Sequence, residues 1–242
     1  MSDPWEPIYE AVRRQQVFLR NPLSPGEGVC RVCRSSAGAG FATCFQCGQH
    51  ARASQTLADA VVPVSYAIKG QQHAHNLAAY KFSPPSQSAQ KALLALSLVF
   101  FRTHISCISN RAGGDFTHLC VVPSTKGRSG AHPMEGILRW SSLPRIQAIG
   151  NAGYAPEDRT FHHDRFMVDA VPRGARVLLA DDTWTTGARI QSLSHALKVA
   201  GANAVVAVVM GRHVNPAHDG SKAIVEQIEN EGFDIGRCSL DD

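Results

Sequence analysis

An apolar segment that runs directly into two adjacent carboxylates is the feature that most restricts the fold of this chain. Residues 177–189 read VLLADDTWTTGAR, and residues 188–200 continue with apolar side chains at helical spacing. Apolar residues followed by acids, hydroxyls, a glycine and a helical pattern predict a buried strand, a tight turn and a helix N-terminus. The segment is therefore predicted to be a strand-to-helix junction.

The turn at this junction carries the groups that a sugar phosphate requires. Asp181 and Asp182 can accept hydrogen bonds from vicinal ribose hydroxyls, while the amides and threonine hydroxyls of residues 183–187 can surround a phosphate. Gly187 allows close approach of the backbone. In the alternative interpretation the acids and threonines only cap the helix, but capping accounts for one polar residue and not for five.

The segment DDTWTTGA, preceded by an apolar strand, resembles the phosphoribosyl pyrophosphate (PRPP) motif of type I phosphoribosyltransferases. In that motif two acidic residues hold the ribose and a TTG turn holds the 5'-phosphate. The resemblance implies that the two aspartates are catalytic, and that PRPP is bound by Asp181, Asp182, Thr183, Trp184, Thr185, Thr186 and Gly187. The chain departs from the family at Arg189, where the family usually has Thr or Ser.

A second junction of the same kind occurs at residues 117–130, which read THLCVVPSTKGRSG. An apolar strand again delivers a short polar loop, and ligands of open parallel sheets bind beyond the carboxyl ends of the strands. Both loops are therefore expected to face one crevice. The resemblance implies that residues 123–128 form the pyrophosphate loop, with Lys126 as a catalytic residue and with Ser124, Thr125, Lys126 and Arg128 in contact with PRPP. A solvated basic turn is the alternative.

Four of the seven cysteines form two CxxC pairs, and ten residues separate the pairs. A hairpin can bring Cys30, Cys33, Cys44 and Cys47 together around a tetrahedral Zn²⁺ ion. Four thiolates leave no open coordination position, so the predicted zinc is structural and supplies local folding energy. A redox CxxC needs only one pair and is the alternative. His50 could replace one cysteine as a ligand.

The order of elements predicts an α/β fold with a small N-terminal module. Apolar strands expected at 58–67, 118–122, 177–180 and 205–210 alternate with helices expected at 89–102, 188–200 and 224–230, which is typical of a mainly parallel sheet flanked by helices. Residues 1–57 are assigned to a helix and zinc module, and residues 58–242 to the α/β domain. Residues 135–149 are expected to be partly helical, and residues 232–242 to add a final strand.

Residues 150–165 are expected to form a loop over the crevice. They carry Arg159, His162, His163 and Arg165 as candidate substrate contacts, although the two histidines are equally typical of a solvated loop.

Charge and hydropathy narrow the classes of partner. A net charge of +4 fits a protein that handles anionic substrates but is too small to indicate nucleic acid binding by itself. We expect no membrane span, because no stretch reaches the ~20 apolar residues that a span requires. The acidic N-terminal segment does not resemble a signal peptide, so a cytoplasmic location is expected.

Taken together, the two CxxC pairs, the diphosphate loop and the PRPP motif resemble the ComF family of phosphoribosyltransferase-like proteins, from about residue 30 to residue 210. The resemblance implies a PRPP-binding, Mg²⁺-dependent phosphoribosyltransferase, in which an unidentified acceptor displaces pyrophosphate. Mg²⁺ would be bound mainly by PRPP oxygens and water. The arginine and asparagine pattern that usually lies between the two loops is not clear in this chain.

Two other functions remain open at the level of sequence. The chain could be a catalytically weak or inactive ComF-like protein that assists DNA uptake or processing, with the zinc module and Arg31, Arg34 and Arg52 contacting DNA or a competence-protein partner. It could also be a purine or orotate salvage enzyme, although such enzymes need no CxxC module. The sequence does not indicate the oligomeric state.

Overall fold

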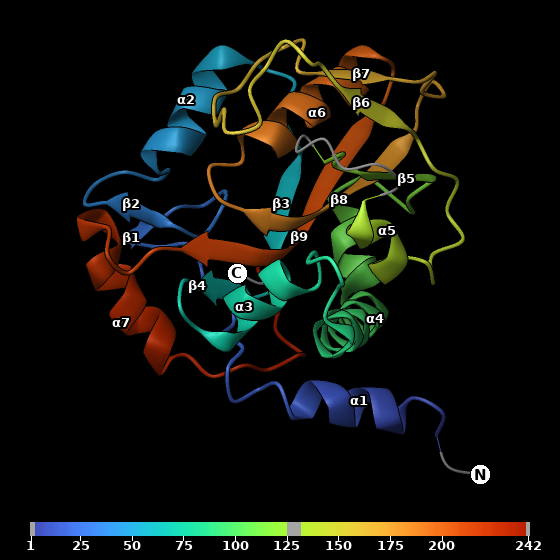
Figure 1. Ribbon diagram of the computed structural model, residues 1–242. Coiled ribbons are helices and arrows are strands. Elements are labelled where there is room, and N and C mark those ends of the chain that lie inside the picture. The colour runs from blue at the N-terminus through green and yellow to red at the C-terminus, as the bar shows by residue number, and fades with distance from the viewer. Residues whose placement is uncertain (1–2, 125–131, 241–242) are drawn as a thin grey trace.

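A computed structural model of the protein describes residues 3–124 and 132–240. Its centre is a parallel sheet with helices on both faces, and a small cysteine-bearing module lies beside it (Figure 1). The strands run in the order β3-β9-β8-β5, and β4 also pairs with β9. The strands of this sheet are β3 (Ala60–Pro63), β4 (Tyr66–Ile68), β5 (His118–Val121), β8 (Arg176–Trp184) and β9 (Ala204–Val214). The predicted α/β class and mainly parallel sheet are confirmed.

The two faces of the sheet belong to two apolar clusters, because successive side chains of a strand point to opposite sides. Leu178 and Val206 pack in one cluster with side chains of α3 (Gln72–Ala79) and α4 (Gln87–Asn110). Leu179 and Val205 pack in the other cluster with side chains of α6 (Ala188–Val199). Strands covered on both faces explain the nearly continuous apolar runs in the sequence. Pro63 lies in β3 at one end of the strand order, where a proline removes no central hydrogen bond.

Helix α4 is the one described helix that is long and apolar enough to cross a membrane. Of its most apolar window, 56% is buried inside the protein. Leu93, Leu96, Val99 and Phe100 contribute to the core on this face of the sheet. Burial of this extent is typical of a core helix.

The N-terminal module packs against the body of the protein. It contains α1 (Glu6–Arg13), β1 (Gly28–Val29), β2 (Ser36–Gly38) and α2 (Phe45–Ala53). Val12 of α1 joins the α4 cluster, while Cys30, Cys33 and Cys47 join the cluster on the α6 face of the sheet. The cysteine module is therefore continuous with the core of the α/β domain.

Residues 135–149 are partly helical as expected, whereas the final strand expected at residues 232–242 is not found among the described residues. Only α5 (Pro133–Ile137) is helical within residues 133–149, and β6 (Ala148–Gly150) instead pairs antiparallel with β7 (Phe166–Val168). The chain after α7 (Lys222–Asn230) adds no strand among the described residues, because side chains of other elements bond to its backbone groups, among them Asp234 and Ile235. A short turn, η1 (Asp219–Ser221), precedes α7.

Candidate functional site

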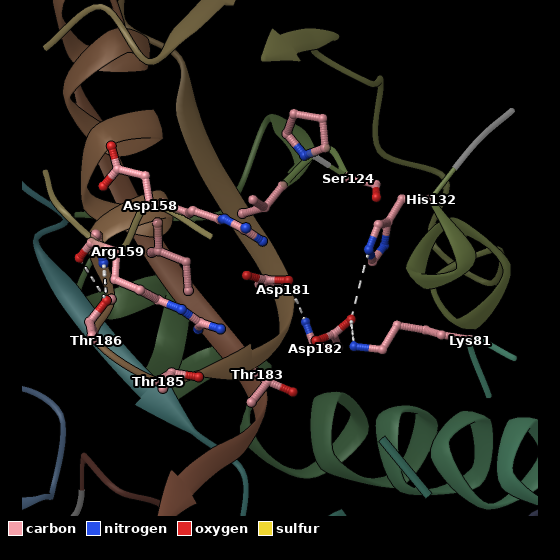
Figure 2. A pocket seen from close by; sticks show the side chains of 16 residues that line it. Lys81, Ser124, His132, Asp158, Arg159, Asp181, Asp182, Thr183, Thr185 and Thr186 are labelled. Carbon is pink, nitrogen blue, oxygen red and sulfur yellow. Dashed lines mark hydrogen bonds and ion pairs between the residues drawn. The ribbon is translucent and has the colours of Figure 1, made fainter. Parts of the chain in front are cut away.

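A cavity of about 260 Å³ opens at the carboxyl ends of β5 and β8, where the sheet topology predicts a ligand site. It brings together Ser124 of the first loop with six residues of the PRPP-like motif (Figure 2), namely Asp181, Asp182, Thr183, Thr185, Thr186 and Gly187. The predicted contacts Thr125, Lys126 and Arg128 lie outside the described residues. The two sequence junctions therefore do meet at one pocket.

The PRPP-like motif contains less turn and more strand than the sequence suggested. Strand β8 continues through the acids to Trp184, and Thr183 and Trp184 still pair with Gly211 and Arg212 of β9. The turn itself is short, and it ends at Gly187, the N-cap of α6, which has φ 84°. The first amides of a 12-residue helix then face the pocket end of the sheet, which favours an anion there.

Trp184, one of the predicted PRPP contacts, is not among the residues that line the pocket. Its ring is 1% exposed and belongs to the core cluster on the α6 face. A methyl group at Gly187 would lie 2.0 Å from Cζ2 of this ring. The glycine is therefore required for packing against Trp184 as well as for its positive φ.

The two aspartates occupy different electrostatic environments. Asp182 accepts hydrogen bonds at Oδ2 from Tyr80 Oη at 2.6 Å and Lys81 Nζ at 2.9 Å, and His132 Nε2 lies 3.7 Å away. Burial by itself would raise the pKa of Asp182, but Lys81, Tyr80 and His132 outweigh it and lower the pKa below its ordinary value. Asp182 is therefore held as a carboxylate.

Among residues 3–124 and 132–240, no lysine, arginine or histidine forms an ion pair with Asp181. Its Oδ1 accepts a hydrogen bond from the Asp182 amide at 2.8 Å, and its side chain lines the pocket. Burial and the neighbouring charge of Asp182 raise the pKa of Asp181 to about 8. One acid of the pair is thus fixed as an anion, and the other can take up or release a proton near neutral pH.

The sequence did not identify Tyr80, Lys81 or His132 as site residues. Lys81 stands 101 residues before Asp182, and no spacing or periodicity connects the two. The one feature of the sequence that could have indicated Tyr80 and Lys81 is their position directly after a helix that follows a strand. Figure 2 shows Lys81 and His132 converging on Asp182 from one side of the pocket.

Residues 150–165 cover the opposite side of the pocket, where Asp158 and Arg159 line the cavity. Thr186 Oγ1 donates to the Arg159 carbonyl at 3.2 Å and thereby attaches the segment to the turn between β8 and α6. Burial lowers the pKa of the neighbouring Arg189, which also lines the pocket. Arg159 and Arg189 thus place two guanidinium groups beside the helix N-terminus.

The other three predicted substrate contacts of this loop are structural. Arg165 is 1% exposed and donates to the carbonyls of Thr160 and Asp158 at 3.1 and 2.9 Å. His162 bonds to the Asp158 carboxylate at 2.7 Å, and His163 bonds to the Ala53 carbonyl at 3.1 Å. These bonds fix the loop, so only Arg159 of the four reaches the pocket.

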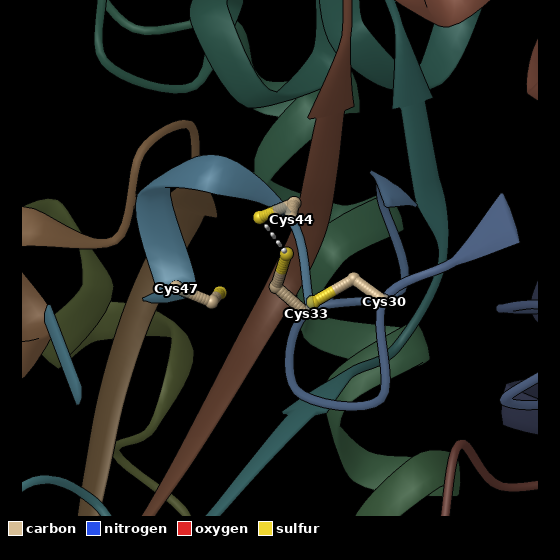
Figure 3. Close-up of side chains that lie close together, drawn as sticks. All are labelled: Cys30, Cys33, Cys44 and Cys47. Atoms are coloured by element: carbon tan, nitrogen blue, oxygen red, sulfur yellow. Dashed lines mark hydrogen bonds between the residues drawn. The ribbon is translucent and has the colours of Figure 1, made fainter. Parts of the chain in front are cut away.

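The four cysteines of the two CxxC pairs form one cluster (Figure 3). Their sulfur atoms lie within 4.8 Å of one another, and Cys33 Sγ and Cys44 Sγ are 3.7 Å apart. Zn–S bonds of ~2.3 Å at tetrahedral angles give an S···S distance of ~3.8 Å, which this spacing matches. His50 is not part of the cluster. The geometry therefore fits a structural zinc ion.

The chemistry of the donor set also fits a cation. Hydrogen bonds with Cys30 and the other thiols raise the pKa of Cys47, because four sulfurs this close cannot all ionise without a compensating positive charge. A bound Zn²⁺ ion would supply that charge and hold all four as thiolates.

One buried side chain connects the cysteine cluster with the pocket motif. Arg212 of β9 is 6% exposed, and it donates from Nε to the Cys33 carbonyl and from Nη1 to the Trp184 carbonyl, each at 3.1 Å. The first carbonyl belongs to a CxxC turn and the second to the end of β8. Arg212 therefore holds both segments in position.

A metal ion bound at the cysteine cluster would stabilise the whole protein, since the cluster is part of the core, and its removal is expected to be destabilising. A chelator should lower the wild-type melting temperature by several degrees, because the loss of even ~2 kcal/mol shifts the transition of a chain of this size by that amount. The shift should be smaller in Cys47→Ser, which is already destabilised. Cys120→Ser removes a buried thiol outside the cluster and is the matched control, expected to respond to chelator as the wild type does. Equal shifts in all three proteins would contradict a structural metal at the cluster.

Comparison of the sequence with protein-family models and with curated proteins gave no match. The functional assignment therefore depends on the geometry of the pocket and of the cysteine cluster.

Proposed function

We propose that the protein is a PRPP-binding, Mg²⁺-dependent phosphoribosyltransferase with a structural zinc site in its cysteine cluster. The observation that carries this proposal is the convergence of two acids, a hydroxyl-rich turn and a helix N-terminus on one pocket. An acidic turn that only capped a helix would not need a cavity, two guanidinium groups and a cation-held carboxylate around it.

The phosphate end of the ligand would occupy the turn. Thr185, Thr186 and Gly187 line the cavity, and the first amides of α6 supply hydrogen-bond donors with a favourable dipole. Arg159 and Arg189 would neutralise the phosphate charge. Arg189 thus gives the departure from the family motif a function, since it replaces a hydroxyl by a cation.

The ribose and diphosphate would lie towards the acids and Lys81. In the reaction, the bond between the ribose anomeric carbon and a diphosphate oxygen breaks, the electron pair leaves with pyrophosphate, and the acceptor's lone pair forms the new bond. Positive charge develops on the ring, and the Asp182 carboxylate, which lines the pocket, would stabilise it. Mg²⁺ would neutralise the diphosphate. Lys81, Ser124 and His132 line this side of the cavity, and the loop with Thr125, Lys126 and Arg128 follows Ser124 in the chain.

The alternative function as a DNA-uptake or processing protein receives less support. Of its three arginines, Arg34 is 4% exposed and donates to the carbonyls of Arg31 and Ser239, so it is occupied inside the protein. Of the three, Arg31 and Arg52 are exposed. Two isolated basic side chains are a weak basis for nucleic acid binding.

Calorimetry with PRPP and Mg²⁺ tests the proposal. The wild type should bind, and Thr185→Val should weaken binding about 10-fold or more, because the phosphate loses a donor that water cannot replace in the pocket. Thr103→Val is the matched control, since that hydroxyl bonds to the Val99 carbonyl within α4. Absence of heat with the wild type, or equal affinities of the two variants, would contradict the proposal. Pyrophosphate release with a panel of free bases would then identify the acceptor and separate a salvage enzyme from a binding protein.

A further inference from the structure

A second group of metal-ligating side chains lies on the other face of the sheet. His104 and Cys107 are three residues apart near the C-terminal end of α4, a spacing that places them on one face of the helix. Cys238 comes from the segment after α7 and belongs to the α4 cluster of the core, whereas three of the four CxxC cysteines belong to the other cluster. The two groups are therefore separate.

The three side chains converge on one point. One ligand atom from each lies within 4.8 Å of the other two. Cys107 Sγ is 3.9 Å from Cys238 Sγ and 3.9 Å from His104 Nδ1. Two sulfurs on a tetrahedral Zn²⁺ ion are ~3.8 Å apart, so small side-chain adjustments bring all three atoms to bonding distance.

The histidine is oriented as a ligand. Its Nε2 lies 2.6 Å from the Ile235 carbonyl oxygen, which can only accept a hydrogen bond, so the ring proton resides on Nε2. Nδ1 then carries the lone pair and faces the two sulfurs. A backbone carbonyl behind the distal nitrogen is the usual support of a metal-binding histidine, because it fixes both tautomer and ring angle.

The segment that carries Cys238 is fixed in place by other contacts. Asn21 exchanges hydrogen bonds with the backbone of Asp234, with its side-chain nitrogen donating to the carbonyl at 3.0 Å and its oxygen accepting from the amide at 2.6 Å. Phe233 packs into the core. His104 is 4% and Cys238 7% exposed, while Cys107 is half-buried and gives access to the group. The donor set is therefore assembled by the fold.

We propose that His104, Cys107 and Cys238 bind a thiophilic divalent cation, Zn²⁺ in the cell, with a fourth position open to water or another ligand. Binding releases two thiol protons and forms two metal–sulfur bonds and one metal–nitrogen bond. One of these protons now lies on Cys107 Sγ, which donates to the His104 carbonyl at 3.0 Å. A Cys107–Cys238 disulfide would require an oxidant and would not account for the orientation of His104 towards the two sulfur atoms. The metal clips the segment after α7 to the core helix.

Cadmium titration of the full, reduced protein tests this site, because Cd²⁺ occupies zinc sites and its thiolate bonds absorb in the ultraviolet. The wild type should bind two ions, one with four thiolates and one with two. Cys107→Ser should lose the second ion and the corresponding third of the total absorbance. Cys107 is the least buried of the three ligands, so its replacement disturbs packing least. Cys120→Ser removes a fully buried thiol outside both groups and should still bind both ions.

A ¹¹³Cd resonance assigned to a mixed sulfur and nitrogen site, present in the wild type and absent from His104→Gln, would support the proposal independently of the optical count. One ion per wild-type chain would overturn it, as would two ions in Cys107→Ser. A mass spectrum of the wild type with Cys107 joined to Cys238 under non-reducing conditions, and no second ion after reduction, would overturn it in favour of a disulfide.

Discussion

Asp181→Asn is expected to raise the melting temperature at about pH 8, and Asp182→Asn is expected to lower it, although the two residues are adjacent. The pKa of Asp181 is raised in the folded protein from 3.8 to about 8, so ionisation of this carboxyl opposes folding as the pH rises through that interval. Its stabilising contribution is complete below the unfolded value and is lost towards pH 8. The amide cannot ionise, so the variant should gain ~1–3 kcal/mol at pH 8 and little at pH 4.

The contribution of Asp182 to stability changes with pH in the opposite direction. Its pKa is lowered in the folded protein, mainly by Lys81 against the effect of burial, so its contribution is present at neutral pH and is lost as the pH falls. Asparagine would leave the Lys81 ammonium and the Tyr80 hydroxyl without their carboxylate partner. Since Lys81 remains 27% exposed and can be hydrated, we expect a loss of ~2–3 kcal/mol, less than for a fully buried pair.

Thermal unfolding of both variants between pH 4 and pH 8 measures these effects, with a shift of about 2–4 °C for each kcal/mol in a chain of this size. Asp219→Asn is the control, because that side chain is 93% exposed and should change nothing at either pH. Shifts of the same sign for Asp181→Asn and Asp182→Asn at pH 8 would contradict the division of roles. An Asp181→Asn variant that is more stable than the wild type but no longer binds the ligand would show that the carboxyl is retained for function at a cost in stability.

Gly187→Ala is expected to be among the most destabilising single substitutions in the chain. The added methyl group would lie 2.0 Å from Cζ2 of Trp184, and alanine is strained at φ 84°. Both effects act at the turn between β8 and α6, so binding at the proposed phosphate site should be lost with the stability. We expect a loss of ~3 kcal/mol or more, or on the order of 10 °C in melting temperature.

Two further variants separate the causes of that loss. Gly136→Ala is the control, because no atom of a described residue lies within 4 Å of its added methyl group and alanine favours the helix in which it stands. Trp184→Phe combined with Gly187→Ala should recover part of the stability, since the smaller ring relieves the collision and leaves only the backbone strain. Additive losses in the double variant would show that the two residues do not interact, against the packing described above.

Local patterns predicted much of the fold. The segment at residues 177–189 combines a buried apolar run with a glycine and a helical repeat, and each of these signals is decided by neighbours in the sequence. The four cysteines of the CxxC pairs were likewise grouped correctly, because their spacing already encodes two ligand turns. The convergence of Ser124 with the acids followed from the rule that parallel strands end at one edge.

The partners of the site were not predictable in this way. Lys81 and Tyr80 reach Asp182 only because α3 packs beside β9, and no local sequence pattern indicates such a contact. Trp184 was included among the predicted PRPP contacts as part of the motif, and the motif did not indicate that β8 continues through it and that its ring enters the core. The segment at residues 232–242 was expected to pair as a strand, whereas side chains from distant elements take its backbone hydrogen bonds.

The position of Arg212 gives the cysteine centre and the pocket a thermodynamic relationship. Its guanidinium bonds at once to the Cys33 carbonyl and the Trp184 carbonyl, so a change in the order of either segment alters the environment of the other. A metal ion that fixes the CxxC turn reduces the conformational entropy that a ligand must remove at the end of β8. Linkage is reciprocal, so a ligand in the pocket would strengthen zinc binding at the cysteine cluster by the same factor.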